Sequence, residues 1–354
     1  MKTDLFGRLA KEKRAILLYG MGNGADKIVA ELSQKSIPVA DFFASDGFVR
    51  GQSFHGKRVL SFSEVRERYA PDEAVVLLAF GSARSEVLAA IQNVASVYEL
   101  LVPDMPVCGG PLFDLSFHET HKSEIAAART LLADEPSKLL YDRIIEFRLA
   151  GCLDTLLGAV SQKSAWELLQ DSRLSVTRIA DFGAYTGDSA REALERFPLS
   201  FILAAEPDRR NFRKLSKWSQ GVEGVTIECH PVAVCNSKGE ACFDDSGNRN
   251  AGLCTGRARA TVATDTPDGL LAGRPVDYIK YDIEGAEAAA LQGTAQAICA
   301  HHPALRIALY HKAEDLFALP LLLQSICPEY DLYLTRERSV PAWDIDLVAI
   351  PKSR

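Results

Sequence analysis

Hydrophobic residues in the first third of the chain occur in short runs separated by helical patterns. Continuous apolar segments, which are typical of strands buried on both faces, cover residues 15–19, 38–44 and 74–80. Stretches in which apolar residues recur every three or four positions follow at 26–35 and 85–94. This alternation predicts a parallel sheet with helices packed on it.

A second alternating series begins near residue 178. Its predicted strands are 178–182, 200–205, 225–229, 276–281 and 305–310, and its predicted helices are 188–197, 209–219 and 286–300. Two final apolar runs, 330–335 and 345–350, are expected to form an antiparallel pair. The fold class predicted is therefore α/β, with two doubly wound, Rossmann-like domains.

The pattern lapses between the two series. Residues 103–111 hold three prolines and two glycines, a composition typical of a linker, and predicted helices follow at 119–133 and 137–149. The chain is accordingly divided into a Rossmann-like domain at 1–105, a helical connector at 106–165 and a second domain at 166–354.

Composition limits the class of protein. Of the 354 residues, 47% are hydrophobic and 25% are charged, which excludes a disordered chain and a collagen-like repeat. The net charge of −7 argues against nucleic acid as a partner, and no apolar run is long enough to cross a membrane. Residues 1–5 lack the apolar core of an export signal. We expect a cytoplasmic protein with no membrane partner, and a homo-oligomer stays open.

The cysteines and histidines do not predict a metal site. None of the eight cysteines forms a Cys-x-x-Cys pair, so they are interpreted as reduced thiols. The segment from His118 to His121 lacks the spacing of a His-Glu-x-x-His zinc motif and is interpreted as a helix cap. The cysteines are Cys108, Cys152, Cys229, Cys235, Cys242, Cys254, Cys299 and Cys327.

The first glycine loop, residues 20–25, fits Gly-x-Gly-x-x-Ala between a predicted strand and helix. Asp46 follows the next strand, where an acid binds ribose in dinucleotide-binding domains. Two interpretations stay open: a nucleotide or nucleotide-sugar site at the helix amino terminus, and a tight turn without a ligand. No catalytic set for hydride transfer accompanies the loop, which disfavours a dehydrogenase.

The second glycine loop differs from the first. Asp181 ends a strand, Gly183 and Gly187 lead into a helix, and Glu206 ends the next strand. A carboxylate in that position can accept hydrogen bonds from both ribose hydroxyls. We expect Gly183 and Glu206 to line one crevice at the carboxyl edge of the sheet. A structural turn with a solvated glutamate is the alternative.

A third motif places charges in a strand that should be apolar. Because side chains alternate along a strand, Lys280 and Asp282 share one face, and Glu284 begins the following turn. Ionisable groups crowded at a ligand-binding edge indicate a functional site. The alternatives are a structural ion pair between Lys280 and Asp282, and a divalent cation held by Asp282 and Glu284.

Together these motifs resemble the S-adenosylmethionine-dependent methyltransferases of the FkbM family. The resemblance rests on residues 181–187, on Glu206-Pro207 and on residues 279–287, and it covers about residues 175–350. It implies a seven-stranded class I methyltransferase sheet with a carboxy-terminal antiparallel hairpin. It also implies methyl transfer to oxygen, typically to a hydroxyl of a sugar or natural product.

The resemblance also suggests site residues. Those expected to bind the cofactor are Asp181, Gly183, Ala184, Tyr185 and Gly187 around the methionine end, Glu206 and Pro207 at the ribose, and His230, Pro231 and Val232 near the adenine. Asp282 is the leading candidate for the base or for a group that orients the acceptor, with Lys280 and Glu284 tuning it. His311, after the fifth strand, is either a rival base or a solvated edge residue.

The function expected is that of an S-adenosylmethionine-dependent O-methyltransferase acting on a small molecule or glycan. Trp343, in the loop before the last strand, is a candidate for stacking on a sugar ring, with packing as its alternative role. The rival hypothesis is a non-catalytic nucleotide or nucleotide-sugar binding protein with a degenerate methyltransferase domain.

Overall fold

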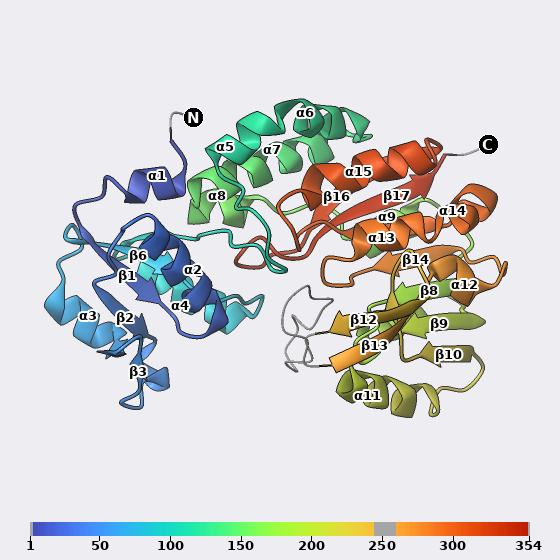
Figure 1. The fold of residues 1–354 in the computed structure, drawn as a ribbon, viewed down its shortest axis with the longest axis horizontal. Coiled ribbons are helices and arrows are strands. Elements are labelled where there is room, and N and C mark those ends of the chain that lie inside the picture. The colour runs from blue at the N-terminus through green and yellow to red at the C-terminus, as the bar shows by residue number, and fades with distance from the viewer. Residues whose placement is uncertain (1–2, 244–259, 353–354) are drawn as a thin grey trace.

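A computed structural model of the protein describes residues 3–243 and 260–352 (Figure 1). Cys254, one of the cysteines interpreted as thiols, lies outside these residues. The chain forms two α/β units, each built on its own sheet, with a group of helices between them in sequence (Figure 1). Within the described ranges, no helix is long and apolar enough to span a membrane.

The first sheet has five parallel strands in the order β5-β2-β1-β6-β7. Its strands are β1 (Ala15–Tyr19), β2 (Asp41–Ala44), β5 (Leu60–Ser61), β6 (Ala74–Leu78) and β7 (Glu99–Leu101). Around it lie α1 (Leu5–Leu9), α2 (Asn23–Gln34), the 3-10 turn η1 (Asp46–Phe48), the small hairpin β3 (Ser53–Phe54) and β4 (Lys57–Arg58), α3 (Phe62–Arg68) and α4 (Ser85–Ala95).

Alternation along β1 explains why helices cover both faces of this sheet. Ile16 and Leu18 pack with α2, whereas Leu17 and Tyr19 pack on the face that carries α4. All four side chains are buried, as expected for a central parallel strand. The continuous apolar runs in the sequence are therefore explained by helices on both faces.

The connecting helices are α5 (Leu115–Thr120), α6 (Lys122–Leu131), α7 (Glu135–Ala150), α8 (Leu153–Gly158) and α9 (Ala165–Asp171). The start of α7 follows a familiar signal, because the Asp134 side chain accepts a hydrogen bond from Ser137 N and Pro136 lies in the first turn. The helix predicted at 119–133 is instead two helices, with His121 at the junction of α5 and α6.

The second sheet confirms the predicted seven-stranded arrangement. Its order is β10-β9-β8-β14-β15-β17-β16, and β17 runs antiparallel to both of its neighbours. The strands are β8 (Arg178–Phe182), β9 (Phe201–Ala205), β10 (Thr226–His230), β14 (Tyr278–Tyr281), β15 (Ala304–Ala308), β16 (Tyr330–Arg336) and β17 (Ile345–Pro351).

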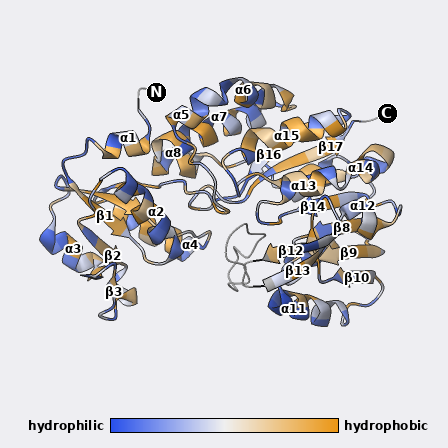
Figure 2. Ribbon diagram, viewed as in Figure 1, coloured by the Kyte–Doolittle hydropathy of each residue, from blue (hydrophilic) through white to orange (hydrophobic). Residues whose placement is uncertain are grey.

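Helices cover both faces of this sheet as well. One face is covered by α9, α10 (Asp188–Arg196) and α11 (Arg209–Ser219), and the other by α12 (Pro267–Leu271), α13 (Glu287–Gln292), α14 (Ala295–His301) and α15 (Asp315–Ile326). Figure 2 shows α11 as mostly hydrophilic, in keeping with its burial of Leu215 alone among its residues. The central strand β1 of the first sheet and β17 of the second carry hydrophobic colours.

The small sheet beside the main one and the division of a predicted helix are among the features of this unit that the sequence did not predict. A small sheet of β11 (Ala233–Val234), β12 (Gly239–Phe243) and β13 (Ala260–Asp265) lies beside the main one. The helix predicted at 286–300 is divided into α13 and α14 near Gly293. A Cβ on Gly293 would lie 2.5 Å from the carbonyl oxygen of Cys235, so the chain requires glycine at this close approach.

The two sheets share one apolar core. A single cluster of buried side chains includes Val76 of β6, Tyr141 of α7 and Ile279 of β14, so it runs from the first sheet through the connector to the second. The backbones also meet directly, because Ser82 N donates to Val340 O over 2.7 Å and Val340 N donates to Ser82 O over 3.0 Å.

Candidate active site

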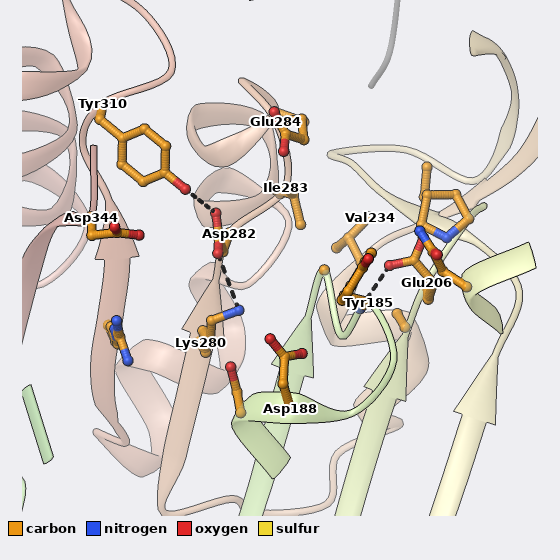
Figure 3. A pocket seen from close by; sticks show the side chains of 18 of the residues that line it. Tyr185, Asp188, Glu206, Val234, Lys280, Asp282, Ile283, Glu284, Tyr310 and Asp344 are labelled. Carbon is orange, nitrogen blue, oxygen red and sulfur yellow. Dashed lines mark hydrogen bonds and ion pairs between the residues drawn. The ribbon is translucent and has the colours of Figure 1, made fainter. Parts of the chain in front are cut away.

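A cavity of about 370 Å³ opens at the carboxyl edge of the second sheet. Figure 3 shows Glu206 and Val234 on one side of it and Tyr310 and Asp344 on the other, with Asp282 between them. Loops after β8, β9 and β14 and the loop before β17 bring these side chains together. Ligands of open α/β sheets bind at this edge.

Some of the predicted site residues line the cavity and others do not. The predicted residues that line it are Gly183, Tyr185, Glu206, Pro207, Val232, Lys280, Asp282 and Glu284. The predicted residues that lie outside its lining are Asp181, Ala184, Gly187, His230, Pro231 and His311. Asp181, Ala184 and His311 are buried behind the lining, so they can act on a ligand only through other residues.

Gly183 allows two loops to meet. Its φ of +81° is in the left-handed region, and a Cβ there would collide with the backbone carbonyl of Asp282. A side chain at this position would push the loop after β8 away from the loop after β14. Glycine therefore keeps the two halves of the cavity together.

Glu206 lies at the end of β9 and holds the loop after β8. Its Oε2 accepts a hydrogen bond from Tyr185 N over 2.8 Å, and its Oε1 accepts one from Asp208 N over 2.9 Å (Figure 3). Burial raises the pKa of Glu206 to about 7, although these two hydrogen bonds oppose the rise. Each oxygen keeps a second lone pair for a ligand donor.

Lys280 lies between two carboxylates. Its Nζ is 3.5 Å from Asp181 Oδ1 and 3.4 Å from Asp282 Oδ2. Burial would lower the pKa of Lys280, but Asp181 and Asp282 raise it above its usual value. Burial also raises the pKa of Asp181 to about 6 despite the nearby lysine. The ion pair considered as an alternative is present, and both Lys280 and Asp282 also face the cavity.

Asp282 is surrounded by groups that stabilise its negative charge. Its Oδ1 accepts a hydrogen bond from Tyr310 Oη over 3.0 Å and lies 3.6 Å from His311 Nε2 (Figure 3). Burial alone would raise the pKa of Asp282, but Lys280 and His311 outweigh it and hold that pKa at about 2. A carboxylate this weakly basic is suited to orienting a ligand rather than to accepting its proton.

Glu284 differs from Asp282 because its pKa is raised rather than lowered. It lines the cavity from a turn in which its own φ is +54°, a conformation that a non-glycine residue rarely adopts. Its Oε2 is 3.5 Å from His311 Nε2 and accepts a weak hydrogen bond from Cys108 Sγ over 3.7 Å. Burial raises the pKa of Glu284 to about 7, with His311 opposing. This carboxyl group can therefore gain or lose a proton near neutral pH.

His311 is completely buried, so its interpretation as a solvated edge residue is wrong. Its Nδ1 lies 2.9 Å from Glu287 Oε1, and Glu287 also accepts a hydrogen bond from Ile283 N. Its Nε2 has no hydrogen-bond partner among the described residues and faces Asp282 and Glu284. Burial would lower the pKa of His311, but Glu287 and the other two carboxylates raise it to about 10. His311 is therefore a buried cation behind the cavity wall.

The sequence analysis missed several lining residues. Asp188, Ser189 and Glu192 come from the first turns of α10, Asn211 from α11, Arg306 from β15, and Glu337 and Asp344 from the loop between β16 and β17. That loop has no hydrophobic periodicity, so no pattern placed it at the cavity. Carboxylates outnumber cations in the lining, and the cations are Lys280 and Arg306.

Trp343 packs against the other unit of the protein. A Cβ on Gly81, just after β6, would collide with its indole ring. The alternative of a packing role for Trp343 is therefore the one the structure shows. Asp344, the next residue, lines the cavity, so this contact lies directly behind the side of the cavity that carries Tyr310 and Asp344.

The first glycine loop does not join this cavity. Gly22 begins α2, while Asp46 accepts hydrogen bonds from Ser63 N over 3.0 Å and from Ser63 Oγ over 2.7 Å. The carboxylate that was expected to bind ribose thus holds the first turn of α3. Nucleotide binding at this loop stays a prediction.

The strand order, the antiparallel β17 and the cavity at the carboxyl edge define a class I methyltransferase fold. Residues 181–335 match the family model described as the Methyltransferase FkbM domain. This match and the fold support a methyltransferase. No curated protein matches the sequence.

The chain is similar to several solved structures, one of which shares its fold over most of its length. The crystal structure of Methyltransferase FkbM from Methylobacillus flagellatus KT is 18% identical, with a TM-score of 0.69 over 95% of this chain and 89% of that chain. An rRNA methylase from Streptococcus thermophilus is 11% identical, with a TM-score of 0.36 over 55% of this chain and 99% of that one. A putative methyltransferase from Streptococcus mutans in complex with SAH is 9% identical, with a TM-score of 0.33 over 53% and 99%.

Proposed function

We propose that the protein transfers a methyl group from S-adenosylmethionine to a hydroxyl of a neutral, polyhydroxylated acceptor such as a sugar, a glycan or a natural product. The observation that carries this proposal is the arrangement of the cavity. Glu206 lies on one side, Tyr310 and Asp344 lie on the other, and Asp282 and Glu284 lie between them (Figure 3).

The cofactor fits the Glu206 side. The unused lone pairs of Glu206 would accept hydrogen bonds from the two ribose hydroxyls. Gly183 and Tyr185 would border the methionine end, while Pro207, Val232 and Val234 would border the adenine. The bound sulfonium supplies an electrophilic methyl group, and its positive charge suits a cavity in which carboxylates predominate.

Glu284 is the residue we assign as general base. Its pKa of about 7 matches a base that works near neutral pH, and it faces the cavity. It would take the hydroxyl proton of the acceptor as the oxygen attacks the methyl carbon. Asp282, the first choice from the sequence, would instead accept a hydrogen bond from the acceptor and orient it, because its low pKa makes it a poor base.

The chemistry of the acceptor side supports a neutral polyol. Glu337, Asp344 and Asp282 offer carboxylate oxygens that accept hydrogen bonds from hydroxyl groups. The same charges would repel a phosphate placed beside them. Burial raises the pKa of Asp344 to about 6, with Asp346 and Asp282 adding to the rise, so this group too is near the neutral range.

Calorimetry and a labelled-methyl assay test the proposal. S-adenosylhomocysteine should bind the wild-type protein and should bind the Glu206→Ala variant far more weakly. Labelled methyl groups should appear on neutral sugars or glycans and should depend on Glu284. Binding of nucleotide sugars but not of S-adenosylhomocysteine would instead support the non-catalytic binding protein.

A further inference from the structure

A second group of metal-binding side chains lies at the edge of the sheet opposite the cavity. His302 follows α14, Cys327 follows α15, and Glu329 comes just before β16. The cavity residues Asp282 and Tyr310 come after the carboxyl ends of β14 and β15, whereas His302 precedes the start of β15. The two sites are therefore separated by the length of the sheet.

The side chains of this group converge. One ligand atom from each of His302, Cys327 and Glu329 lies within 4.8 Å of the other two, and His302 Nε2 is 2.9 Å from Glu329 Oε2. In a tetrahedral zinc site, with bonds of roughly 2.0–2.3 Å, neighbouring ligand atoms are separated by roughly 3.3–3.8 Å. Small side-chain rotations are enough to close these atoms around an ion.

Cys299, whose side chain reaches the residue before Cys327, is the candidate for a fourth ligand. Cys299 Sγ is 3.3 Å from the carbonyl oxygen of Ile326, the residue before Cys327. Two sulfurs, one imidazole nitrogen and one carboxylate oxygen form a donor set that zinc prefers to magnesium or calcium.

The local backbone also favours a cation. Both α14 and α15 end at this cluster, and the carboxyl ends of helices carry partial negative charge. His302 has a φ of +48°, in the left-handed region, which ends α14 and turns the chain into β15. Cys327 is buried, so its thiolate would be shielded from solvent once bound.

We propose that Cys299, His302, Cys327 and Glu329 form a structural Zn²⁺ site that joins the ends of α14 and α15 to the start of β16. Zinc binding would release the two thiol protons, so its affinity rises with pH. All four coordination positions are taken by protein, which is the arrangement of a structural rather than a catalytic zinc. The sequence did not predict this site, because the ligands come as a Cys-x-x-His pair and a Cys-x-Glu pair that meet only in the folded chain.

A cobalt titration of the reduced, chelator-treated full-length protein tests this site. One equivalent of Co²⁺ should give the charge-transfer and visible bands of tetrahedral thiolate coordination, and Zn²⁺ should remove them. The bands should be lost in Cys299→Ser/Cys327→Ser and kept in Cys108→Ser, which distinguishes this site from the Cys108 thiol beside Glu284. Absence of these bands in the reduced wild-type protein would overturn the proposal.

Variants give a second measurement. Cys299→Ser/Cys327→Ser should lower zinc affinity by roughly 100-fold or more, because loss of a group that merely orients a metal ligand already costs roughly 10–100-fold. It should also abolish the zinc-dependent rise in Tm. Cys235→Ser/Cys242→Ser, which removes two cysteines outside the cluster, should retain both properties. Equal zinc affinity in the two double variants, or a Cys299–Cys327 disulfide as the only change, would contradict the site.

Discussion

The indole ring of Trp343 lies against the backbone of Gly81, so a residue of the first unit supports the loop that carries Asp344 into the active-site cavity. The antiparallel pair of hydrogen bonds between Ser82 and Val340 fixes the same loop from the other side. The Asp344 side of the cavity therefore depends on the first unit, none of whose described residues line the Glu206 side.

Replacing Gly81 with valine tests this dependence. The added side chain has no room beside Trp343, so the loop should shift and move Asp344. We expect the KM for the acceptor to rise on the order of 10-fold, a loss of about 1.4 kcal/mol, with the affinity for S-adenosylhomocysteine unchanged. Gly47→Val is the control, because nothing lies within 4 Å of a Cβ at Gly47. An unchanged KM in Gly81→Val would contradict the supporting role.

Glu206 should make cofactor binding depend on pH. Its carboxylate form accepts the ribose hydrogen bonds, and with a pKa of about 7 it becomes protonated as the pH falls below neutrality. Affinity for S-adenosylhomocysteine should therefore be lower at pH 6 than at pH 8. Calorimetry on Glu206→Gln should show weaker binding and should lose this part of the pH dependence. A wild-type affinity that does not change between these pH values would argue against the ribose contact.

Glu284 and Asp282 should differ in kinetics. Glu284→Gln should lower kcat by roughly 10²–10⁴-fold while leaving S-adenosylhomocysteine affinity intact. In the wild-type protein, kcat at saturating cofactor should rise with pH through about 7, as Glu284 loses its proton. Asp282→Asn should act mainly on the KM of the acceptor. If Asp282→Asn abolishes kcat and Glu284→Gln does not, the base is Asp282.

His311 should make stability depend on pH in a defined direction. Its folded-state pKa of about 10 lies above the ordinary value of about 6.5, so its charge stabilises the folded protein most at pH values below about 6.5. This stabilisation should decline as the pH rises from about 6.5 to about 10. Thermal unfolding of wild type and His311→Gln should show the difference in Tm shrinking over that range. A difference that grows with pH would mean that His311 is neutral in the folded protein.

Sequence reasoning succeeded where a local pattern dictates local structure. Alternation in one strand was enough to place Lys280 and Asp282 on the same face. Apolar runs located β1, β2 and β6 of the first sheet and the seven strands of the second, but not β5 or β7. It failed for α15, which is apolar on most sides and contains Pro320, because that helix packs against both α6 and α13 and so lacks a polar stripe.

The burial and the charge of His311 could not be predicted from the sequence either. Its burial and charge depend on Glu287, which lies on a different element and meets it only in the folded chain. The loop that carries Glu337 and Asp344 reaches the cavity through contacts with Gly81 and Ser82, which are far away in sequence. Relationships of this kind are set by tertiary packing, and one-dimensional patterns do not encode them.

The shared apolar core has a consequence for how this protein is handled. A fragment that begins near residue 166 would lose the α7 side chains, among them Tyr141 and Phe147, that cover the cluster around Ile279 and Leu332. The uncovered surface would be a large exposed apolar patch, and such patches promote aggregation. Expression of residues 166–354 alone should therefore yield inclusion bodies. In evolution, the first unit and its connector can be exchanged only for a domain that presents a matching apolar surface.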